Sequence, residues 1–218
     1  MQFLFPEDYT AQIRADILNT IIETDFNKLR TAELASIGEM SSYLSSRYNA
    51  QEIFFNIPNW NDTNPYKKDQ VVYHNTAIYI DLKDNSNTTP PNNYNNTTNY
   101  AINDIVYWQN TYKCIVATTG NEPTDPNYWQ LVTEPAWEQR DPRHPSVVMF
   151  LIDMVLYHLH SRISPRNVPD IRAERYDAAI TWLKMIAKEQ INPALPKPQN
   201  NEKQYIIYGA NPPRDYQF

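Results

Sequence analysis

The chain has 218 residues, with 19 basic and 25 acidic side chains and a formal net charge of −6. This acidic balance disfavours unaided binding to nucleic-acid phosphates, because such binding uses clustered lysines and arginines. The 3 glycines, Gly38, Gly120 and Gly209, lie far apart, which excludes glycine-rich phosphate loops and the GxSxG nucleophile elbow; the single cysteine, Cys114, can form neither an internal disulfide nor a multi-cysteine zinc site.

Two amphipathic helices are predicted in the first fifty residues. Over residues 7–22 and 28–48 apolar side chains recur at helical spacing. The expected buried stripes are Tyr9, Ile13, Ile17 and Ile21 in the first helix, and Leu34, Ile37, Leu44 and Tyr48 in the second. In the second helix Glu33, Glu39 and Arg47 are expected to point outward.

The character of the chain changes between residues 57 and 134. Asn, Thr, Pro and Tyr become frequent, and short alternating runs such as Ile78-Tyr79-Ile80 predict strands. Residues 84–99 are so polar that we expect an exposed loop tip. Residues 69–79 are similar to residues 104–112, with spacings that differ by about one residue, so an internal duplication is a hypothesis here.

Two further helices are predicted over residues 145–163 and 170–190. The first has a broad apolar face with Asp153 outside it, and the second should bury Tyr176, Ile180, Leu183 and Ala187, with Asn167 as a helix cap. The prolines of residues 193–218 predict an extended C-terminal arm. The expected fold is therefore mainly α: a four-helix core (residues 1–56 and 135–192) interrupted by a small antiparallel β insertion (residues 57–134).

Four motifs of the helical part resemble the small head-tail joining proteins of tailed phages, as found in Mu-like prophages. They are Pro6-Glu7-Asp8, Arg47-Tyr48, Leu159-His160-Ser161-Arg162, and RYDAAxxWLxxIAxxxI over residues 175–191. The family continues almost directly after the second motif, where this chain carries its insertion. The resemblance implies a connector, or adaptor, ring between the portal and the tail, without catalysis.

Part of the insertion is similar to small chitin-type carbohydrate-binding modules. The matching residues are Tyr100, Asp104, Val106, Tyr107, Tyr112, Thr118-Thr119-Gly120, Pro123 and Trp129-Gln130-Leu131-Val132. This resemblance implies a compact antiparallel β unit that stacks sugar rings on exposed aromatic side chains. Modules of this kind also occur as plain structural parts of virion proteins.

The candidate glycan-binding residues are Trp108, Tyr107, Tyr112 and Trp129. The alternative is that these aromatic side chains form the small core of the module, above all Trp129. Because Trp108 alternates with Tyr107 along a strand, it is the best candidate for an exposed ring.

The candidate subunit-interface residues are Arg172 and Arg175, with Tyr205, Ile206, Ile207 and Tyr208 of the arm. The two arginines either form ion pairs within their helix or bind acidic groups of a neighbouring subunit. His158 and His160 are two residues apart and cannot share a helix face, and Glu134, Glu138 and Asp141 read as linker acids. We therefore predict no catalytic, cofactor or metal site.

The leading hypothesis is a structural virion protein at the head-tail interface, made in a bacterial cytoplasm. Its expected partners are sister subunits in a ring, twelve if it sits on a portal, then the portal protein and tail or neck proteins, with passive contact to packaged DNA. The chain carries no apolar run that predicts a membrane span. The alternative is a carbohydrate-binding module on a helical scaffold that recognises host or mucus glycans.

Overall fold

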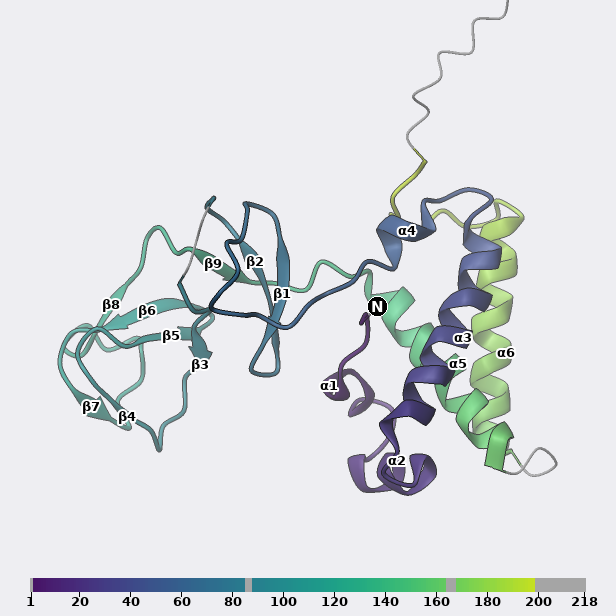
Figure 1. Ribbon diagram of the computed structural model, residues 1–218, viewed down its shortest axis with the longest axis horizontal. Coiled ribbons are helices and arrows are strands. Elements are labelled where there is room, and N and C mark those ends of the chain that lie inside the picture. Colours follow the sequence, from purple (N-terminus) through teal and green to yellow (C-terminus); the bar gives the residue numbers. More distant parts are fainter. Residues whose placement is uncertain (1, 85–87, 164–167, 199–218) are drawn as a thin grey trace, which may run out of the picture.

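The computed structural model describes residues 2–84, 88–163 and 168–198. They form two lobes joined by a narrow waist: a helical body (residues 2–56 and 140–198) and a β insert (residues 57–139) (Figure 1). The structure is 38% helical and 16% strand, with six helices and three sheets in the described part. The prediction of a mainly α fold with a four-helix core is therefore wrong, and the fold is mixed α and β.

Three long helices, rather than four, form the centre of the helical body. α3 (Phe26–Leu44), α5 (Pro145–Ile163) and α6 (Asp170–Ala187) each contact the other two. The shorter helices are α1 (Pro6–Tyr9), α2 (Ala15–Ile22) and α4 (Ala50–Ile53). α5 is long and apolar enough to cross a bilayer by composition, but eight of its residues are buried in this body, from Val147 to Leu159.

The first predicted helix is broken into α1 and α2. The backbone leaves the helical conformation before α2, because Arg14 is extended (φ −68°, ψ 142°). A helical period cannot be carried across such a break. Consequently Ile17, placed on the buried stripe by the sequence pattern, is 45% exposed, whereas its neighbour Leu18 is buried.

Several side chains of the long helices lie on a different face from the predicted one. In α3 Leu34 is exposed and Glu33 is buried, and in α5 Asp153 is buried. α6 buries Ala179, Leu183 and Ile186, while Tyr176 and Ile180 are half-buried and Ala187 is exposed. Each helix has neighbours on more than one side, and this widens and rotates the buried face. Asn167 lies outside the described residues.

The β insert contains two larger sheets and a two-stranded ribbon. In the first sheet β1 (Val71–His74), β2 (Ala77–Asp81) and β9 (Trp137–Gln139) are antiparallel, in that order. In the second, the order is β3 (Asn92–Asn93), β5 (Ile105–Trp108), β6 (Asn110–Cys114), β8 (Trp129–Leu131), with β3 parallel to β5. β4 (Asn99–Tyr100) pairs with β7 (Thr118–Thr119).

The boundaries of the insertion also differ from the prediction. β9 belongs to the first sheet, so the β insert continues past residue 134. The segment predicted as an exposed loop tip contains β3 and the start of β4, and its Pro90 and Pro91 are buried. Trp137 and Tyr79 of the first sheet donate to the carbonyls of Thr88 and Pro91, which accounts for the buried prolines, while residues 95–99 are exposed as predicted.

Equivalent hydrogen bonds recur in the two halves of the β insert. The Asn61 N–H donates to the Tyr66 hydroxyl at 2.6 Å, and the Asn95 N–H donates to that of Tyr100 at 2.8 Å. Three further bonds of the first half have an equivalent in the second. Thr63 N donates to Asn61 Oδ1 as Thr97 N donates to Asn95 Oδ1, and Asp69 N donates to Asp81 O as Asn103 N donates to Cys114 O. Likewise, Trp60 N donates to Tyr73 O as Tyr94 N donates to Tyr107 O. The predicted internal similarity is therefore confirmed at the level of structure.

Each of the two similar units ends with a tryptophan that packs edge-on against the tyrosine of that unit. Tyr66 and Trp137 lie 5.5 Å apart at 72°, and Tyr100 and Trp129 lie 5.2 Å apart at 70°. The copy that ends with Trp129 lies, in sequence, between β2 and β9 of the other. The β insert is thus a host unit (residues 58–82 and 136–139) with a nested unit (residues 92–132) inside one of its connections.

The hairpin turns explain the one-residue difference in spacing. In the host unit β1 and β2 are joined by Asn75 and Thr76, both with positive φ (42° and 66°), as in the tight turns that suit a hairpin. In the nested unit a single residue, Gln109 (φ 61°), separates β5 from β6. Positions before the turn are therefore offset by one residue more than positions after it.

A chimera tests the nested arrangement. Leu82 N donates to Ala136 O at the point where Ile115 N donates to Tyr128 O in the nested unit. Replacing residues 83–135 by residues 116–127 should give the host unit the same connection that the nested unit uses. We expect the helical circular-dichroism signal and a single cooperative thermal transition to be retained. A glycine-serine linker of equal length is the control, and a chimera no more stable than this control would contradict the equivalence.

Candidate functional site

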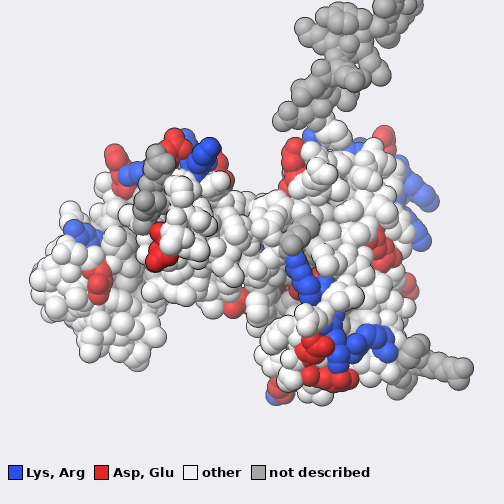
Figure 2. Space-filling view, viewed as in Figure 1, with Lys and Arg blue, Asp and Glu red and all other residues white. Residues whose placement is uncertain are grey.

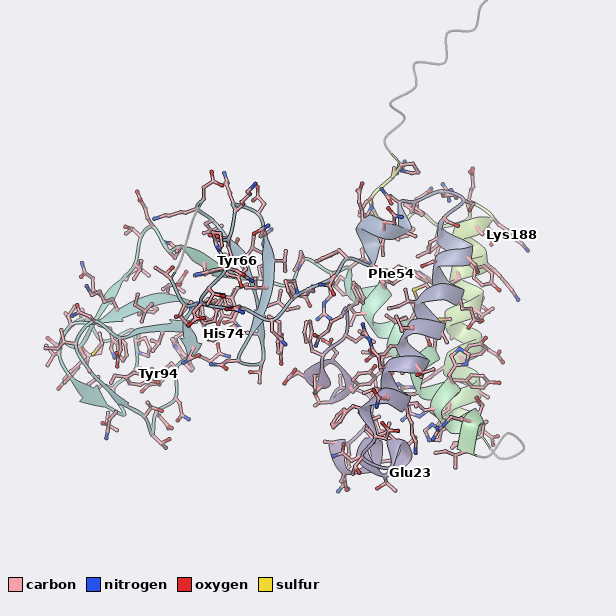
Figure 3. The ribbon with its side chains drawn as sticks, in the orientation of Figure 1. Glu23, Phe54, Tyr66, His74, Tyr94 and Lys188 are labelled. Atoms are coloured by element: carbon pink, nitrogen blue, oxygen red, sulfur yellow. The ribbon has the colours of Figure 1, made fainter. Side chains whose placement is uncertain are left out.

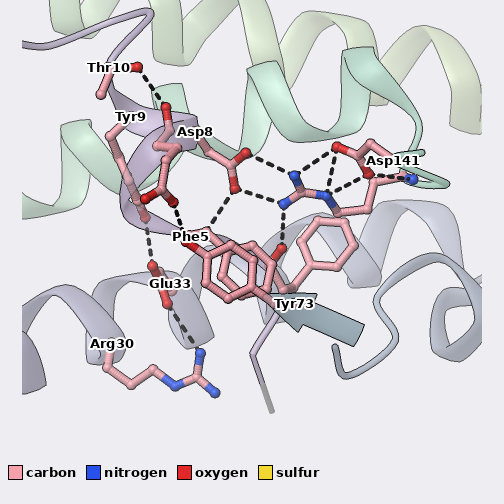
Figure 4. A network of polar contacts seen from close by, with 11 residues as sticks. Phe5, Asp8, Tyr9, Thr10, Arg30, Glu33, Tyr73 and Asp141 are labelled. Atoms are coloured by element: carbon pink, nitrogen blue, oxygen red, sulfur yellow. Dashed lines mark hydrogen bonds and ion pairs between the residues drawn. The ribbon is translucent and has the colours of Figure 1, made fainter. Parts of the chain in front are cut away.

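The best-defined polar site lies at the waist between the two lobes. Arg143 pairs there with Asp8 and Asp141, which are labelled in Figure 4. Its guanidinium donates to both carboxylate oxygens of Asp8 at 2.7 and 2.8 Å, and to both oxygens of Asp141 at 2.8–3.2 Å. It also donates to the Phe3 carbonyl at 2.6 Å. The side chains of Arg143 and Asp8 are 3% and 14% exposed, so this pair is largely shielded from water, whereas Asp141 is 45% exposed.

Burial alone would lower the pKa of Arg143, but its hydrogen bonds to Asp141 and Asp8 and their charges raise it above its ordinary value. The arginine therefore stays charged. Paired forks of this kind are the strongest hydrogen-bonded ion pairs in proteins, and they fix direction as well as distance. Arg143 thus ties α1 to the segment that returns from β9.

Apolar contacts support the same junction from the side of the β insert. The rings of Phe5 and Tyr73 are stacked at 3.9 Å and 8°, and Ile57 and Ile78 are buried in the same cluster. The Tyr73 hydroxyl donates to Glu7 Oε2 at 2.7 Å. Burial, and then this bond to Glu7, raise the pKa of Tyr73. The two lobes therefore share a core and are not tethered by flexible linkers.

Two carboxylates predicted to point outward hold the helices together. Glu39 accepts from the Tyr176 hydroxyl at 2.6 Å and lies 3.0 Å from His158 Nε2, so α3 is bonded to α5 and α6. Glu33 accepts from the Tyr9 hydroxyl at 2.7 Å and from Arg30 at 3.2 Å. Burial raises the pKa of Glu33.

One of the two predicted interface arginines, Arg175, lines a groove between α1, α5 and α6. Its volume is ≈ 670 Å³, with Val148, Met149 and Ile152 among its lining residues. Arg175 is 43% exposed and approaches Asp153 of α5 at 3.5 Å, so the pair expected within its own helix is not the one formed. Arg172 is half-buried and donates to the Gln12 carbonyl at 3.1 Å.

The four candidate glycan-binding residues do not lie together on one surface. Trp129 is 2% exposed and its indole N–H donates to the Asn121 carbonyl at 3.0 Å, so it is a core residue. Tyr107 is half-buried and, by the alternation along β5, points to the face opposite Trp108. By the strand register, Trp108 and Tyr112 lie on the same face of the sheet, which also carries the buried Val106, Cys114 and Trp129 of the core.

Trp108 is the exposed ring of that face. It is 38% exposed, and its ring lies 5.6 Å from that of Tyr94 at 77°, so the edge of one ring meets the face of the other. Tyr112 is paired with Leu131, which is 50% exposed. Tyr94 and Leu131 were missed by the sequence reading, because neither the polar segment around Tyr94 nor the strand end at Leu131 marked them as surface contacts.

Arg143 was also missed. Its sequence context, Asp141-Pro142-Arg143, gives one acid beside one base and no sign of the second acid, Asp8, which is remote in sequence. Of the other candidates, Tyr205 to Tyr208 lie outside the described residues. The arm begins close to the body, since Leu195 is buried and Asn49 N donates to the Pro196 carbonyl at 2.9 Å.

The comparisons find no relative: no family model, no curated protein and no solved structure matches the chain.

The Arg143 junction makes a quantitative prediction. Arg143→Met removes the guanidinium and leaves the Asp8 carboxylate and the Phe3 carbonyl buried without it. We expect the free energy of unfolding in urea to fall by about 3–5 kcal/mol. Arg14→Met is the matched control, because Arg14 pairs with Asp16 at an exposed site and should cost less than about 1 kcal/mol. Equal losses in the two variants would contradict this role.

Proposed function

We propose that this protein is a head-tail connector of a tailed phage, a subunit of a ring that joins the portal to the tail and helps to close the capsid exit after DNA packaging. The observation that carries the proposal is that the motifs of the resemblance meet in one body. Arg47 donates to the Ile186 carbonyl at 2.8 Å and to Asn192 at 2.7 Å, and Tyr176 donates to Glu39. Asp8 holds Arg143.

These contacts show that the motif residues have internal partners, which is what a shared helical framework requires. Arg47, just after α3, bonds to the end of α6, and Asp8 anchors the N-terminal segment. Tyr176 of α6 bonds to Glu39 of α3, which also contacts His158 of α5. The rigid waist also supports the proposal, since a ring subunit with a locked insert presents it at a fixed angle to its neighbours.

The groove beside α6 is the proposed contact with a sister subunit. Arg175 is exposed there and its internal partners are distant, at 3.4 Å from Gln12 and 3.5 Å from Asp153. Because these internal bonds are long, the guanidinium can form a bidentate ion pair with a carboxylate of a neighbouring subunit. Residues 205–208 of the arm are proposed to reach the portal or a tail protein.

Native mass measurement of the protein, alone and with the portal of the same phage, tests the proposal. We expect a ring on the portal, and Arg175→Glu should reduce ring formation at least tenfold, because the substitution reverses a charge at the contact. Arg14→Glu is the matched control on an exposed site of the same body.

A wild-type protein that stays monomeric with the portal would overturn the connector proposal. If rings form equally well with Arg175→Glu, the ring proposal stands and the assigned contact is wrong. Truncation after residue 198 tests the arm and retains the buried Leu195 and the Pro196 carbonyl bond. Loss of portal binding with an intact thermal transition is the expected result.

A second function, glycan binding by the β insert, is favoured by one observation. Trp108 is a half-exposed ring held in place by Tyr94, beside Tyr112 and Leu131 on the same face. Such a ring can cover the apolar face of a pyranose at little cost in side-chain entropy. In the view of Figure 2 charged side chains are sparse over the β insert and more frequent over the helices, as suits a neutral ligand.

A glycan array with the wild type and Trp108→Ala tests this function. We expect binding by the wild type and a loss of about tenfold or more for the variant, since a stacked ring contributes on the order of 1 kcal/mol beyond its buried area. Ile102→Ala removes another exposed side chain of the nested unit and is the control. No binding by the wild type would contradict the glycan-binding function and assign the β insert a purely structural role.

A further inference from the structure

The host unit carries an aromatic pair at the position that Tyr94 and Trp108 occupy in the nested unit. Trp60 and His74 correspond to them, because Trp60 N donates to Tyr73 O as Tyr94 N donates to Tyr107 O. The Trp60 and His74 rings lie 5.2 Å apart at 76°, close to the 5.6 Å and 77° of the nested pair. The geometry of the pair is thus preserved although both side chains differ.

Both pairs contain a buried polar atom without a hydrogen-bond partner. In the described part of the chain three such side-chain atoms are found, and two of them are His74 Nε2 and Tyr94 Oη; the third is His144 Nδ1 at the waist. The fully bonded Tyr66 and Tyr100 hydroxyls show that the rest of each unit satisfies its tyrosines. An unpaired buried group costs about 1–3 kcal/mol, so its presence at both pairs calls for a reason.

The two pairs are electrically neutral. Burial lowers the pKa of His74, against a smaller raising effect of a hydrogen bond with the Asn92 side chain, and burial raises the pKa of Tyr94. Residues 57–134 hold four lysines and eight acids, a net charge of 4 − 8 = −4. An anionic ligand is therefore disfavoured, and a neutral one with hydroxyl and amide groups is suited to this surface.

Amide side chains connect the two pairs. Asn75, at the turn next to His74, donates to Asn92 Oδ1 across the boundary of the units. Asn92 begins the nested unit, is exposed, and lies on the same side of its strand as Tyr94. His74 and Tyr94 are labelled in Figure 3, where both belong to the β insert. Two amide side chains, groups that can also bind hydroxyls, therefore lie at the boundary between the units that carry the two pairs.

We propose that Trp60 and His74 form a second binding site, equivalent to that of Tyr94 and Trp108, and that the two sites hold one neutral oligosaccharide chain across both units. This inference rests on the glycan-binding function proposed for the nested unit. Two sites on one rigid body turn the second contact into an intramolecular step. A longer chain should therefore bind much more tightly than a short one, without any new kind of contact.

The test uses chitin oligosaccharides from two to six sugars, the ligand series implied by the resemblance, together with the glycan array. Binding is measured by titration calorimetry for the wild type, Trp60→Ala, Trp108→Ala and the double variant. We expect the wild-type affinity to rise at least tenfold from the shortest to the longest chain that binds. Either single variant should abolish that rise, and both should retain weak binding of the short chain.

Matched variants keep a folding defect apart from a binding defect. Trp60 packs partly against the host core, so Trp60→Phe, which keeps a ring, should restore the length dependence if stacking is the cause. Thermal unfolding of each variant shows whether the β insert is intact. Ile102→Ala, at an exposed position outside both pairs, should leave the length dependence unchanged.

The outcomes separate the two proposals. If Trp108→Ala weakens binding while Trp60→Ala binds every chain length as the wild type does, the second site is wrong and the glycan function stands. If the wild type binds neither the oligosaccharides nor any glycan of the array, both are wrong. If Trp60→Ala alone removes binding, the host pair is a site but the two are not equivalent.

Discussion

The shape of this protein depends on the bonds of one buried guanidinium. Arg143 connects Asp8 of α1, the Phe3 carbonyl and Asp141, so the first residues of the chain and the segment leaving the β insert meet at one group. Its side chain is 3% exposed, and a charge buried to this extent is stable only with all its partners in place. These bonds therefore hold the start of the chain against the segment that follows β9.

The same junction explains how a helical body accommodates a large insertion. The chain leaves the body after α4 and returns before α5. The outgoing crossing contributes Ile57 to the cluster with Phe5 and Ile78. The returning crossing contacts the same cluster, because Arg140 N donates to the Ile78 carbonyl and Arg143 lies over the Phe5 ring. The insert therefore buries apolar surface against the body at the point of exit. The body and the insert therefore share buried contacts and are not separate units joined by a linker.

The nested architecture of the β insert shows how one small β unit can accept another within one of its connections. A unit of this size has few core residues. Its tyrosine–tryptophan contact and its asparagine turn therefore account for a large part of the contacts that hold it together. Entry to and exit from the nested unit lie together, since Lys83 donates to the Glu134 carbonyl at 2.9 Å. An insertion at such a place leaves the host hydrogen bonds intact, and loop closure costs little more for a longer connection.

The sequence by itself determined the helical segments over 28–48, 145–163 and 170–190 to within a few residues, the β character of the middle of the chain and its internal similarity. Local periodicity and composition carry that information. It also marked Trp108 as the ring to expect at the surface, from alternation along one strand.

Tertiary structure decided what local patterns cannot encode. Glu33 and Asp153 are buried because Tyr9 and Arg175 reach them from other elements, and Trp129 is a core residue because Tyr100 packs on it. Arg143 gained its role from Asp8, more than a hundred residues earlier in the chain, and no pattern within one segment records a contact made by folding.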